Sequence, residues 1–419
     1  MGESKTMKNL MFLRILSKGQ SLFAMCRTGI LCAAFVTSHA QTAHAQSFFA
    51  SNVTDPTAGV DRGSTSGIRK LDTPTTFLTF DTFGSDDIGP TILGFGHVQP
   101  NVLTAGDQLD VAGVVAGLSE TDGLELSAGG IGYRTHALGA DTTAFANFNY
   151  SDVTLGSPTG LAFDIKGTLS TAAAGLRLVR QRDEMTSLTS TVEIIGRRAT
   201  STSFGAPIIN EDLRLLRLST LYQQGLPFLA QRRFAAAITK GIDGFGASAP
   251  TNPLASAPGA TSDFLRASFS AEASLPLSDL WIANAGLIGQ WSADSLPISQ
   301  RCGYGTNAYA RGFDQGYALG DQCIGTRIEL AYNVEDPKVD TRGIRFTQAY
   351  FGVDVGRLWN NANLLSPSSS NNWSSGSLGL RTIQGDLIGE AVVTRIFNDP
   401  GGTAPQDRTR FWLRAGLRF

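Results

Sequence analysis

The residue types that most often carry out catalysis are sparse in this sequence. Beyond the N-terminal segment two histidines remain, His97 and His136, and neither lies near a Gly-x-Ser-x-Gly turn that could present a serine nucleophile. The carboxylate pairs Asp86-Asp87 and Glu211-Asp212 fall at the ends of strand-like segments beside turns, where carboxylates are usually solvated. We therefore expect no catalytic residues and no enzyme activity.

Two cysteines, Cys302 and Cys323, could either pair with each other or contribute to a metal site. A metal site is disfavoured, because neither of the two histidines stands in a ligand-spaced cluster. If the chain is exported to an oxidising compartment, two cysteines there are expected to form a disulfide. We predict that disulfide, no metal site and no cofactor.

The first 45 residues have the features of a secretory signal peptide. Basic residues from Lys5 to Arg27 precede or flank the apolar run Gly29 to Val36, and Ala43-His44-Ala45 is a small-residue cleavage site. The apolar run is far shorter than the ~20 residues that a membrane-spanning helix needs, so a retained anchor is the weaker interpretation. We predict cleavage after Ala45, with Ala40 as the alternative.

The charge of the exported chain argues against a nucleic-acid partner. The signal segment holds five basic residues and one acidic residue of the 34 and 36 in the whole sequence, which leaves 29 and 35 and a formal net charge of −6. A chain of this charge has no overall basic field for nucleic acid. Residues 46–72, rich in Ser, Thr, Gly and Asp without sustained periodicity, are interpreted as a flexible periplasmic lead.

From residue 73 onwards the sequence alternates with the period of β-strands. The last segment shows it most clearly, because alternate residues from Phe411 to Phe419 are apolar, whereas Arg414 and Arg418 lie between them. This pattern fits a strand with one face towards lipid and one towards a wet interior. Periodicity alone leaves a soluble β-sandwich open, but the arginines argue against a dry interior. A strand that ends at Phe419 suits recognition by the outer-membrane assembly machinery.

About sixteen alternating segments can be counted, and an even number is typical of closed bacterial barrels. An open sheet edge in hydrocarbon would leave backbone groups unpaired. A barrel of this size has a lumen too wide for the wall's own side chains to fill. We predict an all-β fold, an antiparallel transmembrane β-barrel of about 16 strands over residues 73–419. The expected strands are 75–83, 90–99, 106–118, 122–134, 141–152, 163–179, 186–200, 211–223, 231–241, 262–274, 279–293, 324–334, 346–359, 373–383, 386–397 and 407–419.

The two longest connections are residues 241–261 and 292–322. The second holds both cysteines and Arg311, and connections of more than ~15 residues are usually functional or disordered. A disulfide across its base argues for order.

This connection and a later strand resemble the transporters of two-partner secretion, the haemolysin secretion/activation (ShlB/FhaC/HecB-type) family of the outer-membrane assembly superfamily. The resemblance covers the barrel region, and its motifs agree in order and spacing. The matching residues are Gly289-Gln290-Trp291, Leu296-Pro297, Gly303 and Gly305, Arg311-Gly312-Phe313, Gly320-Asp321, Glu329-Leu330, and the strand run Gly352 to Arg357 with Gly352, Asp354 and Gly356.

In that family the long loop folds back into the lumen, where the arginine at its tip meets the aspartate of the strand motif. The resemblance therefore implies that Arg311 pairs with Asp354. Strand parity permits this, because Asp354 shares a face with Gly352 and Gly356. A guanidinium–carboxylate contact is directional, and the glycines leave room for the loop tip. The alternative is that Arg311 is a surface residue and Asp354 an ordinary lumen charge.

The sequence also departs from the family pattern. Ala310 stands where a β-branched residue is usual, Cys323 stands near a customary glycine, and Gly303 and Gly305 are not adjacent. Family members also carry periplasmic POTRA domains that recognise the exported partner. Residues 46–72 fall below the ~40 residues that even a stapled small domain needs. We expect these domains to be lacking here, which puts partner recognition in the usual way in doubt.

The resemblance implies an outer-membrane translocation pore that exports an unfolded partner protein of the haemolysin or adhesin kind. The expected partners are that secreted protein, the assembly machinery and the lipid bilayer. The alternative is a passive or structural porin-like barrel that has lost its partner-recognition domains.

Overall fold

The computed structural model describes residues 73–419 except 86, 118–123, 137, 182–184, 226–230, 304, 306–308, 315, 335–337, 341–342, 363–366 and 400–407. The predicted signal peptide (1–45) and lead (46–72) lie outside the described residues.

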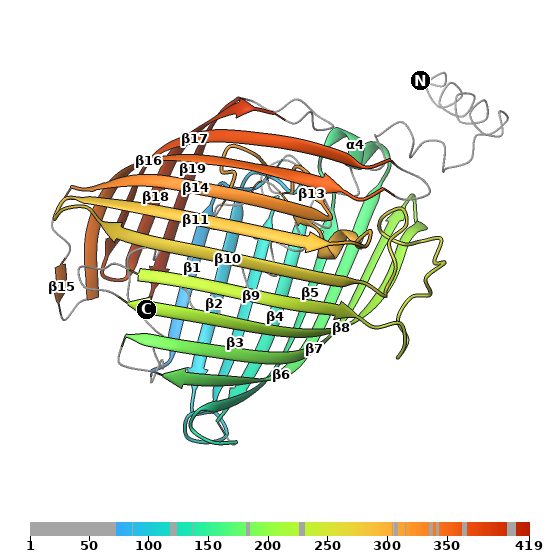
Figure 1. Ribbon diagram of the computed structural model, residues 1–419, viewed down its shortest axis with the longest axis horizontal. Coiled ribbons are helices and arrows are strands. Elements are labelled where there is room, and N and C mark those ends of the chain that lie inside the picture. The colour runs from blue at the N-terminus through green and yellow to red at the C-terminus, as the bar shows by residue number, and fades with distance from the viewer. Residues whose placement is uncertain are drawn as a thin grey trace, which may run out of the picture.

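Sixteen antiparallel strands form a closed wall, which confirms the predicted fold class (Figure 1). Each wall strand pairs with the next one along the chain, and the short strand β15 (Lys338–Asp340) pairs with β16 beside this wall. The wall strands are β1 (Thr75–Asp81), β2 (Ile92–Pro100), β3 (Gln108–Ala116), β4 (Leu126–Thr135), β5 (Thr142–Thr154), β6 (Ile165–Gln181), β7 (Thr186–Ser203), β8 (Ala206–Gly225), β9 (Gln231–Gly241), β10 (Leu265–Pro276), β11 (Trp281–Ser292), β14 (Gln322–Asn333), β16 (Gly343–Asn360), β17 (Ser369–Gln384), β18 (Leu387–Asn398) and β19 (Thr409–Arg418).

The barrel closes where the last strand meets the first. β19 pairs with β1 from Phe77 opposite Arg418 to Asp81 opposite Arg414. Beyond this ladder, the backbones of Thr76 and Phe419 exchange hydrogen bonds of 2.8 and 2.9 Å. Closure gives every wall strand two neighbours, which satisfies the backbone groups that hydrocarbon cannot solvate.

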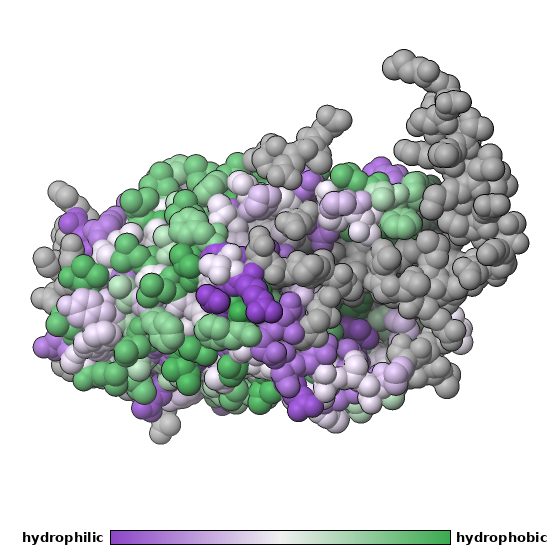
Figure 2. Space-filling model, turned by 90° about the horizontal axis from the view of Figure 1, so that it is seen from above, coloured by the Kyte–Doolittle hydropathy of each residue, from purple (hydrophilic) through white to green (hydrophobic). Residues whose placement is uncertain are grey.

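Alternate residues of the wall face outwards and inwards, as the sequence period requires. On β19, Phe411 and Leu417 are exposed at 63% and 47%, whereas Trp412 between them is 5% exposed and faces the interior. On β16, Phe351 and Val355 are exposed, and Gly352 and Asp354 are buried. Figure 2 shows hydrophobic residues over much of the visible wall, as a lipid-facing surface needs.

The two ends of the barrel differ in the length of their connections. Gly385 and Asp386 alone link β17 to β18 at one end, while residues 242–264 and 293–321 connect strands at the other. In bacterial outer-membrane barrels the short turns are periplasmic, so the long connections lie at the extracellular end. The connection after β5 holds the five-residue helix α4 (Pro158–Ala162), capped by Ser157. None of the described helices is long and apolar enough to cross a membrane.

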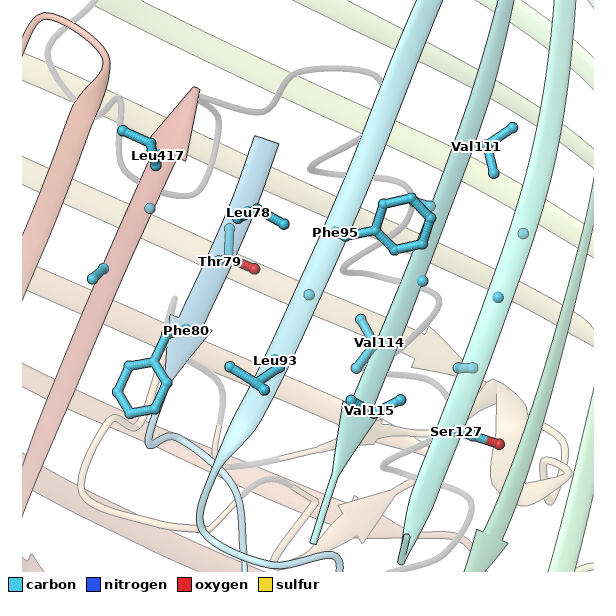
Figure 3. Close-up of a pocket in the computed structure, with 18 of the residues that line it drawn as sticks. Leu78, Thr79, Phe80, Leu93, Phe95, Val111, Val114, Val115, Ser127 and Leu417 are labelled. Atoms are coloured by element: carbon cyan, nitrogen blue, oxygen red, sulfur yellow. The ribbon is translucent and has the colours of Figure 1, made fainter. Parts of the chain in front are cut away.

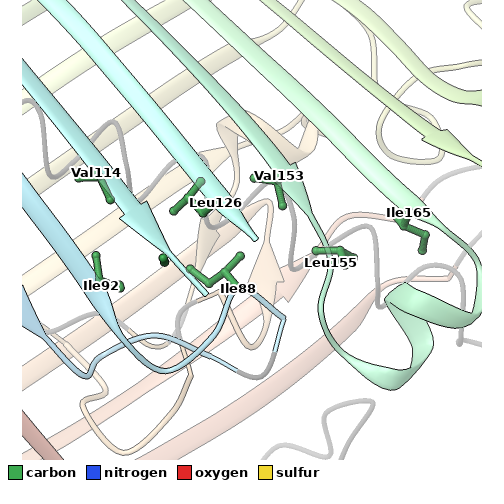
Figure 4. Packing of buried hydrophobic residues seen from close by; sticks show 8 residues of the cluster. Ile88, Ile92, Val114, Leu126, Val153, Leu155 and Ile165 are labelled. Atoms are coloured by element: carbon green, nitrogen blue, oxygen red, sulfur yellow. The ribbon is translucent and has the colours of Figure 1, made fainter. Parts of the chain in front are cut away.

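A hydrophobic cluster lies inside the extracellular end of β2 to β6 (Figure 4). Ile88, from the connection between β1 and β2, is fully buried against Ile92, Val114 and Leu126. This connection therefore folds inwards over one side of the bore. Because the cluster is apolar and close-packed, it excludes water from that part of the interior.

An apolar groove of about 940 Å³ lies on the opposite, lipid-facing side of the wall between β19 and β5 (Figure 3). Leu78, Phe95 and Leu417 contribute to its lining, and the directly opposed glycines Gly113 and Gly129 leave it without side chains at that point. Because the groove faces hydrocarbon, bilayer acyl chains can fill it.

Candidate functional site

The connection between β11 and β14 forms a hairpin that we call the loop hairpin, residues 293–321. Its two short strands, β12 (Cys302–Gly303) and β13 (Leu319–Gly320), pair antiparallel. A disulfide joins Cys302 to Cys323 at the start of β14, which is the pairing expected from the sequence. The disulfide ties the beginning of the loop hairpin to the wall and so limits where its tip can lie.

Arg311, at the tip of the loop hairpin, is buried among side chains on the inner face of three wall strands. Its Nη2 donates to Oε2 of Glu329 on β14 at 2.7 Å, and its Nη1 donates to the hydroxyl of Tyr350 on β16, also at 2.7 Å. Glu390 on β18 lies 3.8 Å from Nη1. The interpretation of Arg311 as a solvent-facing residue is therefore wrong, because its side chain is 1% exposed.

The structure corrects the predicted partner of Arg311. Its direct ion pair is with Glu329, whereas Asp354 accepts from Nε of Arg327 at 2.8 Å. The register explains this, because Arg327 lies directly opposite Asp354 and Glu329 lies directly opposite Gly352. A Cβ at position 352 would stand 3.7 Å from Nη2 of Arg311, so the missing side chain leaves space beside the guanidinium.

Arg311 and Asp354 nevertheless belong to one buried polar network, here called the lumen cluster. Arg381 on β17 contacts Oε1 of Glu329 at 2.8 Å, so Glu329 accepts from two guanidinium groups. The hydroxyl of Tyr350 donates to Glu390 at 2.7 Å. Three cations and three anions therefore balance, which avoids an uncompensated buried charge. The lumen cluster comprises Arg311, Arg327, Glu329, Tyr350, Asp354, Arg381 and Glu390.

The lumen cluster keeps Arg311 charged. Burial lowers the pKa of the Arg311 guanidinium, but the attraction of Tyr350 and the three carboxylates outweighs burial and raises that pKa above its usual range. The guanidinium also lies 4.9 Å from the centroid of the Tyr350 ring, a favourable cation–π distance. Arg311 can therefore act as a permanent electrostatic anchor for the tip.

The residues after Arg311 fill the space between the tip and the wall. Phe313 is 2% exposed and packs with Trp373 and Ile396 on the inner face. A Cβ on residue 312 would lie 2.8 Å from the Cβ of Ser375. A Cβ on residue 356 would overlap the indole of Trp373, at 2.2 Å from its nearest carbon. Both glycines are thus required by close approach.

Ala310 precedes this motif with a φ of +59°, which explains the departure from a β-branched residue at this position. A β-branched side chain is strongly disfavoured in left-handed backbone, whereas alanine tolerates it better.

Asp321 holds the base of the loop hairpin. Its carboxylate accepts from the backbone amides of Leu296 and Asn361 at 2.8 Å each and pairs with Arg301 at 3.1 Å. Gly320 beside it leaves room for the carbonyl of Trp359, which would stand 2.9 Å from a Cβ. These contacts connect the two ends of the loop hairpin to the wall.

Sequence reasoning missed Glu329 as the ion-pair partner and Arg327, Arg381 and Glu390 as neighbours. The signal for Arg327 and Glu329 was available, because both lie on the inner face of one alternating strand. Their pairing with Asp354 and Arg311 depends on register, which alternation does not specify.

The sequence model of the haemolysin secretion/activation protein ShlB/FhaC/HecB matches residues 131–382, more than half of this chain. The chain belongs to the ShlB/FhaC/HecB family. The matched region includes the loop hairpin and all of β16. No curated protein sequence matches the chain.

Solved structures share the fold of this ShlB/FhaC/HecB family member. CdiB from Escherichia coli superposes with a TM-score of 0.69 at 19% identity, covering 83% of this chain and 63% of CdiB. CdiB from Acinetobacter baumannii gives 0.65 at 18% identity, covering 83% and 60%. BamA from Haemophilus ducreyi lacking POTRA domains 1–3 gives 0.55 at 13% identity, covering 83% and 70%. The chain thus spans less than two thirds of the length of either CdiB. Its family and its fold make it an outer-membrane β-barrel.

Proposed function

We propose that this chain is an outer-membrane translocation pore of the two-partner secretion type, which exports an unfolded partner protein of the haemolysin or adhesin kind. Membership of the ShlB/FhaC/HecB family carries the proposal. A loop hairpin anchored by Arg311 among inward-facing residues supports it, because a 16-stranded barrel needs an occluding element to avoid leakage.

In this mechanism the polar inner wall offers a wet path for an extended polypeptide, and the loop hairpin occludes or organises that path. The lumen cluster holds the tip in one position through directional guanidinium contacts. Export needs no nucleotide, since folding of the partner outside the cell withdraws it from the bore. The chain performs no catalytic step.

An export assay with Arg311→Ala tests the role of the anchor. A large exported protein encoded next to this chain, where one is found, is co-expressed as the candidate partner and measured in the medium. We expect export to fall severalfold, because the tip loses its contacts with Glu329 and Tyr350. Arg198→Ala is the control, because the Arg198 side chain is 61% exposed and its ion pair with Asp212 is long, at 4.0 Å. If export and conductance are both unchanged in Arg311→Ala, Arg311 does not act as the anchor that this mechanism requires.

Single-channel recording separates this function from the porin-like alternative. A barrel occluded by the loop hairpin is expected to be closed or to flicker, and Arg311→Ala is expected to increase its open time. A large steady conductance in the unaltered protein, with no effect of Arg311→Ala, would favour a porin.

A further inference from the structure

Two arginines near the extracellular end of the wall face outwards, towards the membrane. Arg357 on β16 and Arg395 on β18 are both exposed. Towards the extracellular end, the outward faces of the two strands read Val355, Arg357 and Trp359 on β16 and Val393, Arg395 and Phe397 on β18. Each strand therefore presents an apolar residue, an arginine and an aromatic residue in the same order. This order is expected where the apolar band of a barrel meets the lipid headgroups.

Outward-facing basic residues at the same end of other strands are neutralised by the protein itself. Lys166 on β6 pairs with Asp164 at 2.9 Å. Lys240 on β9 pairs with Asp263 of the following connection. On that side of the wall the positive charges are therefore already compensated by carboxylates of this chain.

Arg357 and Arg395 differ from these lysines. Within the part of the chain that the structure describes, no carboxylate lies within 4.0 Å of either guanidinium group. Asp399, the carboxylate closest in sequence to Arg395, accepts from the hydroxyl of Tyr317 at 3.0 Å. Two exposed positive charges therefore remain uncompensated at the boundary with the headgroups.

Neutral contacts hold the guanidinium group of Arg357 in place. Its Nη2 donates to the hydroxyl of Ser370 on β17 at 2.9 Å, and the group lies 5.1 Å from the centroid of the Trp359 ring. A hydrogen bond to a hydroxyl and a cation–π contact orient a guanidinium group without cancelling its charge. Arg357 is thus positioned for an anion that comes from outside the chain.

The two arginines lie on either side of β17. Arg357 is directly opposite Asn372 of that strand, and Arg395 is directly opposite Gly376. Four residues along β17 and two strand spacings place their Cα atoms roughly 17 Å apart, a span that two long side chains shorten. Phe397 leans over β17 between them, since a Cβ at position 376 would lie 2.6 Å from its ring. The surface between the arginines is therefore apolar.

We propose that Arg357 and Arg395, here called the outer arginine pair, bind the phosphate groups of a saccharolipid in the outer leaflet of the outer membrane. Such a lipid carries phosphates on a sugar headgroup directly above its acyl chains. The forked donors of a guanidinium group fit phosphate oxygens. Phe397 and the valines below the arginines offer an apolar surface to the acyl chains.

The inference does not depend on export, because it concerns the outer surface of the wall and not the bore. A barrel that exports nothing can bind a lipid there, and an exporter can lack such a site. Failure of the experiment below therefore leaves the proposed function untouched.

Native mass spectrometry of the full-length barrel in a non-ionic detergent measures the binding directly. The probe is lipid A with two phosphates, titrated against the unaltered protein and against the double variant Arg357→Gln/Arg395→Gln. The matched control is Lys166→Gln/Lys240→Gln, which also removes two outward-facing charges near the extracellular end. Heat-dependent mobility in gel electrophoresis shows that each variant is folded.

We expect the apparent affinity for lipid A to fall about tenfold or more in Arg357→Gln/Arg395→Gln, because charge-assisted hydrogen bonds to phosphate are lost. The control should change it less than about twofold, since those lysines belong to exposed ion pairs. Lipid A with a single phosphate should bind the unaltered protein more weakly than lipid A with two. This preference should disappear in Arg357→Gln/Arg395→Gln, which a merely structural role of the arginines would not produce.

Three results would overturn the proposal. Equal losses in the two double variants would show that lipid A responds only to net charge. Equally tight binding of phosphatidylglycerol would show that the outer arginine pair does not select a saccharolipid. Displacement of lipid A by inorganic phosphate at matched ionic strength would show that the site takes a free oxyanion and not a lipid.

Discussion

At the scale of single residues, the site is determined by which side chains the register places opposite each other. Asp354 has Arg327 directly across the strand pair, so its nearest guanidinium comes from the wall rather than from the loop hairpin. Glu329 lies opposite Gly352, and Arg311 reaches it beside this gap. A Cβ at position 352 would lie 2.8 Å from the Ser377 hydroxyl but 3.7 Å from Nη2 of Arg311, so the close approach at this glycine is to Ser377.

Glu329→Gln is expected to destabilise the folded barrel by about 3–5 kcal/mol, the usual cost of removing one partner from a buried ion pair. Both Arg311 and Arg381 would lose a carboxylate at a site from which water is excluded. The measurement is the urea midpoint of the purified barrel, followed by tryptophan fluorescence.

Asp386→Asn is the control for this measurement. Asp386 pairs with Arg418 at 3.0 Å, but its side chain is 59% exposed, and exposed pairs contribute only ~0–1 kcal/mol. Equal losses in the two variants would show that the lumen cluster contributes no more than a surface ion pair.

At the scale of elements, the periplasmic turn between β2 and β3 is organised around one carboxylate. Asp107 accepts hydrogen bonds from the backbone amides of Val102, Leu103 and Thr104 and from the hydroxyl of Tyr133. Burial by itself raises the pKa of Asp107, but these hydrogen bonds outweigh it and lower that pKa to about 2. The turn therefore depends on an ionised side chain.

The depressed pKa predicts how this turn responds to acid. A carboxyl group with a folded pKa of about 2 and an unfolded pKa of about 3.9 stabilises the turn fully above about pH 4. That stabilisation is lost as the pH falls through about 2. Pepsin cleavage at Leu103, which is 76% exposed, should accelerate over this range relative to cleavage at Leu138 in the next turn.

Asp107→Asn supplies the contrast. This variant should be cleaved readily at Leu103 at every pH, with no further acceleration in acid. If the unaltered protein and the variant show the same pH profile, the Asp107 hydrogen bonds do not control the order of the turn.

The position of the loop hairpin is also explained by specific contacts. The disulfide and Asp321 fix its base, and Arg311 fixes its tip, so the chain between them cannot swing out without breaking contacts at one end. Movement of the loop hairpin is therefore easiest at the tip, where the contacts are noncovalent.

At the scale of the whole molecule, closure depends on the contact between the first and last strands. β1 has only seven residues, and the backbone pairing of Phe419 with Thr76 extends the short ladder by one step. Phe419 is itself 64% exposed on the outside of the barrel. We infer that this side chain is free for contact with the assembly machinery, the role expected from the sequence.

Phe419→Ser tests that role. The backbone pairing can persist in this variant, so a loss must arise from the aromatic side chain. We expect less folded barrel in the outer-membrane fraction, measured by the heat-dependent mobility of the barrel in gel electrophoresis. Phe397→Ser, which removes another exposed phenylalanine at 58% exposure from β18, is the control. Equal amounts of folded protein in both variants would contradict an assembly signal at Phe419.

Alternation was sufficient to predict sixteen strands and which face of β16 or β19 points inwards, since side-chain direction in a strand depends only on position parity. Several strands, such as β8 and β17, extend beyond their predicted limits. The additional residues still pair with a neighbouring strand. Those of β17 are polar, so hydrophobic patterning does not reveal them.

The sequence by itself determined the strand faces, the pairing of Cys302 with Cys323 as an expectation, and the residues of the loop motif. Only the tertiary structure decided that Arg311 contacts Glu329 and that Asp354 pairs with Arg327. Parity is a local property of the chain, whereas an ion pair requires a register between strands and a position for a distant hairpin. Those depend on closure of the barrel, which brings residues far apart in sequence to the same level of the wall.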